Sequence, residues 1–224
     1  MISHELRCIF VHVQKTGGSS IRGALRMAQS DAHKHRFAIE LRALYGADTW
    51  NQYFKFAFVR NPWDRLVSWW EMMRRNVVEG RPRNGFQRHI MERARTFAEF
   101  LQRCDTEYPD ADGAKWIYRN QVDYLRDRDG VLLVDFVGRF EQLQLDFSRV
   151  AARLNVVPIT LPHVNGTIRR PYASYYSREL RELVAERYAK DIEAFGYRFA
   201  EESDYAAAAP QSAAPANSLA ARGD

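Results

Sequence analysis

Short, continuous apolar runs alternate along the chain with longer segments of helical periodicity. Three runs, at 8–13, 54–59 and 131–137, are rich in β-branched and aromatic side chains, which is typical of strands buried on both faces of a parallel sheet. Apolar residues at helical spacing predict five helices. These residues are Ile21, Leu25 and Ala28; Leu66, Trp69, Trp70, Met73 and Val77; Phe97, Phe100 and Leu101; Leu143, Phe147, Val150 and Leu154; and Leu180, Leu183, Val184, Tyr188 and Ile192. The alternation predicts an α/β fold, a three-layer sandwich with a central parallel β-sheet.

Polar residues at the ends of these segments predict where two of the helices begin. Thr96 and Glu99 have the spacing of a capping box, and Ser177 is a suitable N-cap for the last helix, which we expect to end at Gly196. The stretch 74–95 is rich in Arg, Asn and Gly, and we expect it to form a loop or irregular insertion over the site.

The bulk composition is that of a globular protein with one domain. Hydrophobic residues make up 46% of the 224 residues, which is enough for one core, and we assign residues 1–200 to a single domain. Residues 201–224 are rich in Ala, Pro and Ser, and we expect a disordered tail. The net charge of +5 suits an anionic ligand but does not select one.

The cysteines and the hydropathy pattern exclude several classes of protein. Cys8 and Cys104 lie far apart and show no metal-ligand spacing, so we expect buried free thiols, with no disulfide and no metal site. No run reaches the roughly 18 apolar residues that a membrane span needs, and no apolar leader precedes the first strand. These features predict a cytoplasmic protein without an integral membrane segment.

The turn after the first strand is the most informative segment of the chain. Residues 15–20 read K-T-G-G-S-S, and a helical pattern begins directly after them. A strand, a turn of small residues and a helix start together form a cradle of N–H groups that suits an anion. Lys15 precedes the glycines, whereas the lysine of the ATP-binding motif G-x-x-x-x-G-K-S/T follows them. This order points away from kinases and ATPases.

A second segment, 56–68, places an arginine at the same edge of the sheet. The strand ends at Arg60, Pro62 opens a helix, and Ser68 lies about one turn into that helix. A guanidinium and a hydroxyl that converge in this way suit a terminal phosphate. Alternatively, Arg60 forms an ion pair with Asp64, and Ser68 is an ordinary helical residue.

Together the two segments resemble the sulfotransferases, and in particular the carbohydrate branch that includes the heparan and chondroitin enzymes. The resemblance extends over about residues 8–199. The matching segments are 14–20, Q-K-T-G-G-S-S; 56–68, F-A-F-V-R-N-P-W-D-R-L-V-S; 121–125; 135–141; 161–165; 175–177; and 188–197. Gln14 departs from the family, which usually has Pro there, but this change removes no charged contact. The resemblance implies the P-loop nucleotide-kinase-like fold of these enzymes.

The resemblance also implies the sulfuryl donor, 3′-phosphoadenosine 5′-phosphosulfate (PAPS), as co-substrate. Lys15 would bond the oxygen that bridges sulfur and phosphorus, and Arg60 and Ser68 would hold the 3′-phosphate. The residues expected at the 5′-phosphate are Thr16, Gly17, Gly18, Ser19 and Ser20. No metal is needed if the lysine and the helix supply the counter-charge.

A hydroxyl acceptor also needs a base, and a histidine suits proton removal at neutral pH. His35 opens the pattern H-x-x-x-x-E-L at 35–41, which is similar to the segment that carries the catalytic histidine of heparan 6-O-type enzymes. His33 is an alternative base. A further alternative is that no histidine is the base, since His33 and His35 could both be exposed loop residues. His12 lies within the predicted strand and is interpreted as a core histidine.

The resulting functional hypothesis is PAPS-dependent sulfation of a hydroxyl group on a saccharide or glycan, with His35 as base and Lys15 at the leaving group. The runner-up is a P-loop-type nucleotide or small-molecule kinase. A third possibility is a basic nucleic-acid-binding protein, but the basic residues are interspersed with acidic ones. The missing membrane anchor favours a soluble enzyme of bacterial type. The sequence does not identify the acceptor or the oligomeric state.

Overall fold

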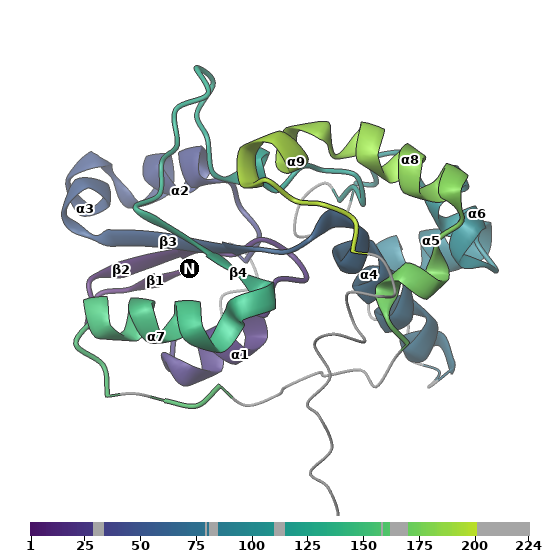
Figure 1. Cartoon of the computed structure of the whole chain (residues 1–224). Helices are drawn as coiled ribbons and strands as arrows, with labels where there is room; N and C mark the ends of the chain where they lie inside the picture. The colour runs from purple at the N-terminus through teal and green to yellow at the C-terminus, as the bar shows by residue number, and fades with distance from the viewer. Residues whose placement is uncertain are drawn as a thin grey trace, which may run out of the picture.

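The computed structural model has a four-stranded sheet with helices on both faces (Figure 1). It describes residues 1–28, 34–78, 80, 85–109, 115–157, 159–161 and 170–200. The strands are β1 (Ile2–Ser3), β2 (Cys8–Val11), β3 (Phe54–Val59) and β4 (Phe136–Arg139), and they lie side by side in this order. β2, β3 and β4 run parallel, and β1 pairs antiparallel with β2. The α/β class and the parallel central sheet predicted from the sequence are confirmed.

The register of the parallel strands brings their carboxyl ends to one edge of the sheet. Ala57 in the middle strand lies opposite Val11 in β2 and Val137 in β4. All of β2 and the last four residues of β3 are buried, which explains their unbroken apolar sequence. Because ligands of such sheets bind at the carboxyl ends, the segments that leave β2 and β3 are where a site is expected.

Two layers of helices cover the sheet (Figure 1). One face carries α1 (Gly18–Ala24) and α7 (Leu143–Arg153), and the other carries α2 (Ala38–Tyr45) and α3 (Ala47–Gln52), with α9 (Ala189–Phe195) on the same side. Each face has its own apolar core. The first includes Phe10, Ile21, Phe56, Phe58, Phe147 and Val150, and the second includes Ile9, Val11, Leu41, Trp50, Ala57 and Val59. Alternate residues of β2 and β3 therefore enter opposite cores.

A third group of helices lies beyond the carboxyl ends of the strands (Figure 1). It consists of α4 (Pro62–Val78), α5 (Gly85–Arg93), α6 (Phe97–Arg103) and α8 (Arg178–Arg187). Its core includes Trp63, Trp70, Phe86, Phe100, Tyr118 and Tyr188. Three short 3₁₀ helices complete the described elements: η2 (Val122–Tyr124), η3 (Phe140–Gln142) and η4 (Tyr172–Tyr175). The carboxyl edge of the sheet thus faces a helical wall.

The predicted helix ends are confirmed at three positions. Thr96 accepts a bond from the Glu99 N–H, and the Glu99 carboxylate accepts one from the Thr96 N–H, which completes the capping box. The Ser177 hydroxyl accepts from the N–H of Leu180 at the start of α8. Gly196 ends α9 with φ of +63°. The last helix was predicted as one piece, but it breaks at Tyr188 into α8 and α9.

Two predictions of the fold are wrong in part. The third strand was expected at 131–137, but β4 spans Phe136–Arg139, because the apolar residues before it form a short hairpin in which Leu133 donates to the Leu125 carbonyl. The stretch 74–95 was expected to be irregular, but α4 continues to Val78 and α5 occupies 85–93. α5 forms because its Phe86 and Ile90, one turn apart, pack into the helical core.

Cys8 and Cys104 are both buried free thiols, as expected. Among the described residues, no helix combines the length and the apolar character that crossing a membrane requires. The tail expected at 201–224 lies outside the described residues.

Candidate active site

The loop between β2 and α1 takes two unusual backbone conformations. Lys15 has φ of +68° and Gly17 has φ of +86°, and the lysine pays a steric cost there that a glycine does not. The Thr16 hydroxyl is buried and donates to the Val13 carbonyl at 2.8 Å, so this bond stabilises the loop from within. Strained residues of this kind persist where the surrounding structure holds them in place.

The rest of the predicted phosphate loop opens α1. Gly17 is the N-cap residue, and no side chain caps the helix. A side chain at Gly17 would meet Leu143, whose Cδ2 atom lies 2.9 Å from the position of a Cβ. Ser19 is exposed, whereas Ser20 is buried. Of the two serines expected at the 5′-phosphate, Ser19 is therefore the accessible one.

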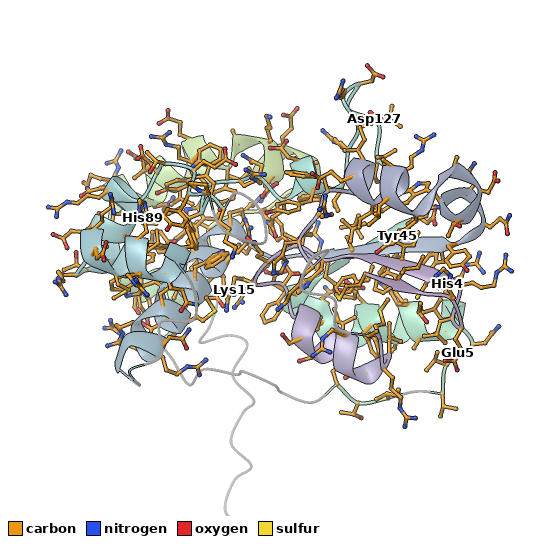
Figure 2. All side chains as sticks on the ribbon, turned by 180° about the vertical axis from the view of Figure 1, so that it is seen from behind. His4, Glu5, Lys15, Tyr45, His89 and Asp127 are labelled. Carbon is orange, nitrogen blue, oxygen red and sulfur yellow. The ribbon has the colours of Figure 1, made fainter. Side chains whose placement is uncertain are left out.

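Lys15 reaches from this loop to the helical wall. Its Nζ lies 3.2 Å from the Met72 Sδ atom on α4. Figure 2 shows Lys15 where the sheet meets the helical group, whereas His4 and Glu5 lie at the far end of the sheet. The half-buried Lys15 therefore places an ammonium group at the carboxyl edge.

Arg60 follows β3 and is directed at the same loop. Its Nη1 donates to the Lys15 carbonyl at 3.1 Å, and its Nε and Nη2 both lie 2.7 Å from Asp64 Oδ2. The guanidinium stacks on the Phe140 ring, 3.8 Å from its centroid. The ion pair with Asp64, which was the alternative expectation, is present. The same arginine also contacts the lysine loop, and its binding of a phosphate stays a prediction.

The face of α4 that carries Ser68 also looks toward the loop. Asp64, Ser68 and Met72 follow one another at intervals of four residues, so they share one face of the helix. Asp64 on this face holds Arg60, and Met72 on it contacts Lys15. The half-buried Ser68 lies between them. Three of the predicted residues, Lys15, Arg60 and Ser68, are thus brought together.

The backbone of Arg60 is fixed by a buried glutamine. The Gln121 side chain accepts from the Arg60 N–H at 2.9 Å and donates to the Arg60 carbonyl at 2.7 Å. Asp191 on α9 holds the glutamine, because its carboxylate accepts from the main chain and side chain of Gln121 and from the Val122 N–H. Burial raises the pKa of Asp191, while these donors oppose that shift.

Asn61 turns the chain from β3 into α4. Its side-chain oxygen accepts from the N–H groups of Trp63 and Asp64, so it caps the helix ahead of Pro62. Its own N–H donates to the Glu141 carboxylate at 2.6 Å. Burial raises the pKa of Glu141, and this N–H bond opposes the rise. The direction of α4, and with it the placement of Ser68, follows from this cap.

Arg65 on α4 is fully buried and supports the lysine loop from the interior of the protein. Its Nε donates to the Gln14 carbonyl at 3.0 Å, and its Nη1 donates to the Arg119 carbonyl and the Tyr188 hydroxyl, each at 3.1 Å. Its Nη2 has no hydrogen-bond partner among the described residues. Sequence reasoning missed Arg65, Gln121 and Asp191. All three lie within the segments that carry the family resemblance, which was the available signal.

His35 is half-buried and lies beside the loop that precedes Lys15. Its Nδ1 is 3.1 Å from the His12 carbonyl oxygen. Because a carbonyl oxygen only accepts, Nδ1 is the donor in this bond, and the basic lone pair of the neutral ring then lies on Nε2. The rings of His35 and His12 are 4.5 Å apart. His33, the alternative base, lies outside the described residues.

His12 is a buried histidine, as expected, with only 5% of its surface exposed. It follows the last residue of β2 and does not lie within the strand as the sequence predicted. Burial lowers the pKa of His12 well below its usual range, and the positive charges of His35, Lys34, the amino terminus and Arg22 act in the same direction. Its ring is therefore neutral at pH 7.

A model of the sulfotransferase family matches residues 1–198, which is almost the whole described chain. The chain belongs to the sulfotransferase family. No curated protein and no solved structure matches it. Membership of the family fits the P-loop-like fold and supports transfer of a sulfuryl group to a hydroxyl-bearing acceptor. In the described part of this sulfotransferase, no group of three or more His, Cys, Asp and Glu side chains is arranged to hold a metal ion.

The buried, neutral His12 makes the stability of this sulfotransferase depend on pH. The unfolded chain binds a proton at this histidine near pH 6.5, whereas the folded chain does so only at much lower pH. Stability from this group is therefore complete above about pH 6.5 and falls by up to about 1.4 kcal/mol for each pH unit below it. Urea unfolding of the native chain and of His12→Gln, measured between pH 5 and 8, tests this. The free energy of unfolding should depend less steeply on pH in the variant than in the native chain. An equally steep dependence in both proteins would show that His12 binds its proton as readily in the folded chain as in the unfolded chain.

Proposed function

We propose that this protein is a PAPS-dependent sulfotransferase that transfers the sulfuryl group to a hydroxyl of a carbohydrate. The observation that carries the proposal is the convergence of Lys15, Arg60 and the Ser68 face of α4 at the carboxyl edge of the sheet. The Lys15 loop and Arg60 come from neighbouring parallel strands, β2 and β3, and a hydrogen bond joins them. The carbohydrate acceptor rests on the resemblance of the sequence to the heparan and chondroitin enzymes.

The two ends of the donor would be held by two different segments. Arg60 and Ser68 would bind the 3′-phosphate, which distinguishes this nucleotide from ATP. Asp64 and Phe140 already fix the orientation of the guanidinium plane. Arg60 would therefore lose little conformational freedom when it binds the phosphate. The Lys15 loop would bind the 5′-phosphosulfate through the N–H groups of Gly17, Gly18 and Ser19 and the Ser19 hydroxyl.

Lys15 and His35 would take opposite roles in the transfer. The acceptor oxygen forms a bond to sulfur as the bond from sulfur to the 5′-phosphate oxygen breaks, in line with it. Lys15 stabilises the charge that grows on the departing oxygen. His35 takes the acceptor proton on Nε2, because the His12 carbonyl already occupies the proton on Nδ1. The products are a sulfate ester and adenosine 3′,5′-bisphosphate.

Calorimetry with three ligands tests the donor assignment. Adenosine 3′,5′-bisphosphate should bind more tightly than ATP–Mg²⁺, and a single-stranded oligonucleotide should not compete. Arg60→Ala should weaken binding of the bisphosphate about 10- to 100-fold, which corresponds to one charge-assisted contact of about 1.5–3 kcal/mol. Preference for ATP–Mg²⁺ would favour the kinase alternative and overturn the proposal.

The matched control for this titration is Arg7→Ala. Arg7 is exposed and contacts Gln52 and Tyr53 at the opposite end of the sheet, so its loss should leave the affinity unchanged. Circular dichroism of each variant establishes that it is folded. An Arg60→Ala protein that is folded and binds the bisphosphate with native affinity would remove Arg60 from the site.

Kinetics of His35→Ala test the base. The variant should lower kcat at least about a hundredfold and leave the affinity for adenosine 3′,5′-bisphosphate intact, because the base acts on the acceptor and not on the donor. His4→Ala is the control, since His4 is exposed and bonds Tyr53 far from the loop. Near-normal turnover of the His35→Ala protein would show that another group is the base.

A further inference from the structure

The His12 side chain contacts both the phosphate loop and the candidate base, although the mechanism above assigns it no role. Its ring lies against the start of α1 on one side and against the His35 ring on the other. Phe10 stacks on it from the strand, with centroids 5.2 Å apart. One buried ring therefore connects β2, the phosphate loop and the candidate base.

The contact with Gly18 is close enough to exclude any side chain at that position. A Cβ on Gly18 would lie 1.8 Å from His12 Nε2 and 2.2 Å from its Cδ2. Nε2 thus occupies the space into which a side chain at the first residue of α1 would project. The five-membered ring sets how near the helix start comes to the end of β2, and a larger ring would push the two apart.

The second contact concerns the orientation of His35. The His12 main chain accepts the proton of His35 Nδ1, and the His12 side chain covers one side of the His35 ring at 4.5 Å. The first contact sets the tautomer, and the second restricts how the ring tilts. Substitution of the His12 side chain removes the second contact and leaves the first in place, so the two are separable by experiment.

The ring also carries a polar atom that ordinary core packing would avoid. His12 Nδ1 is buried and has no hydrogen-bond partner among the described residues. A leucine or methionine would fill an apolar site without this cost. The flat imidazole ring fills the space between Gly18 and the His35 ring.

We propose that His12 is a positioning residue for sulfuryl transfer: its ring holds His35 and the start of α1 at a fixed separation. The base and the phosphate loop then keep the relative positions that in-line transfer between acceptor and donor requires. The proposal rests on the proposed function, because it assumes that His35 accepts the acceptor proton and that the loop holds the donor. A displacement of about 1 Å in such an alignment costs on the order of a hundredfold in rate.

The kinetic test compares His12→Ala with the native chain and with His4→Ala as control. The proposal predicts that kcat falls 10- to 100-fold, on the order of the cost of misalignment. It also predicts that the Kd for adenosine 3′,5′-bisphosphate changes less than about threefold, since the loop keeps its own bonds. His12→Gln, which keeps the reach of the side chain but loses the ring, should show the same split, and it replaces His12→Ala if that variant does not fold.

A double-mutant cycle tests the contact with Gly18 independently of turnover. Gly18→Ala alone should lower the unfolding midpoint and weaken bisphosphate binding, because its Cβ overlaps the His12 ring. In the His12→Ala background the same substitution should have little effect on either quantity, since the space is vacant. Additive effects in both measurements would show that the ring does not hold the helix start.

The outcomes separate the two proposals. If the native chain binds the bisphosphate and transfers sulfate but His12→Ala has a normal kcat, the positioning role is wrong and the proposed function stands. If His12→Ala lowers kcat and the bisphosphate affinity by the same factor, the ring positions only the phosphate loop, and the proposal that it also positions His35 is wrong. If the native chain does not bind the bisphosphate, the proposed function itself fails.

Discussion

The pair of hydrogen bonds between the Gln121 side chain and the backbone of Arg60 is the interaction on which the site depends. The amide saturates both main-chain groups of Arg60, as a neighbouring strand would, so the residue after β3 is held like a residue of the sheet. Its guanidinium is thereby directed at the Lys15 carbonyl instead of solvent. Without this pairing, the chain would leave the sheet with two buried main-chain groups unbonded.

Buried charge supplies the rigidity around this pair. Asp191 bonds Gln121 from α9, and Arg65 bonds the Gln14 carbonyl just before Lys15. Tyr188, at the break between α8 and α9, bonds Arg65. Tyr188 and Asp191 are both fully buried and lie three residues apart, so this part of the chain directs a hydroxyl and a carboxylate to the interior. These links hold Lys15 in its left-handed conformation, which a lysine seldom takes alone.

The sequence predicts the parts of the fold and of the site whose cause is local. β3 and the Thr96 cap are evident because unbroken apolar runs and capping spacings are short-range patterns. The third strand was misplaced because the apolar run at 131–134 belongs to a hairpin, and an apolar run does not tell which partner it packs on. Gln121 was not recognised as a support because its partner, Arg60, lies far away along the chain. His35 was found only through resemblance to a family.

The central claim is that two segments hold two different phosphates, the Lys15 loop the 5′-phosphate and Arg60 with Ser68 the 3′-phosphate. Phosphorus NMR of adenosine 3′,5′-bisphosphate tests it directly, since the two phosphates give separate resonances. In the native chain both resonances should shift on binding. In the Arg60→Ala protein, under concentrations that keep it loaded, the 5′ resonance should still shift and the 3′ resonance should stay near its free position. Equal shifts of both resonances in the variant would contradict the account.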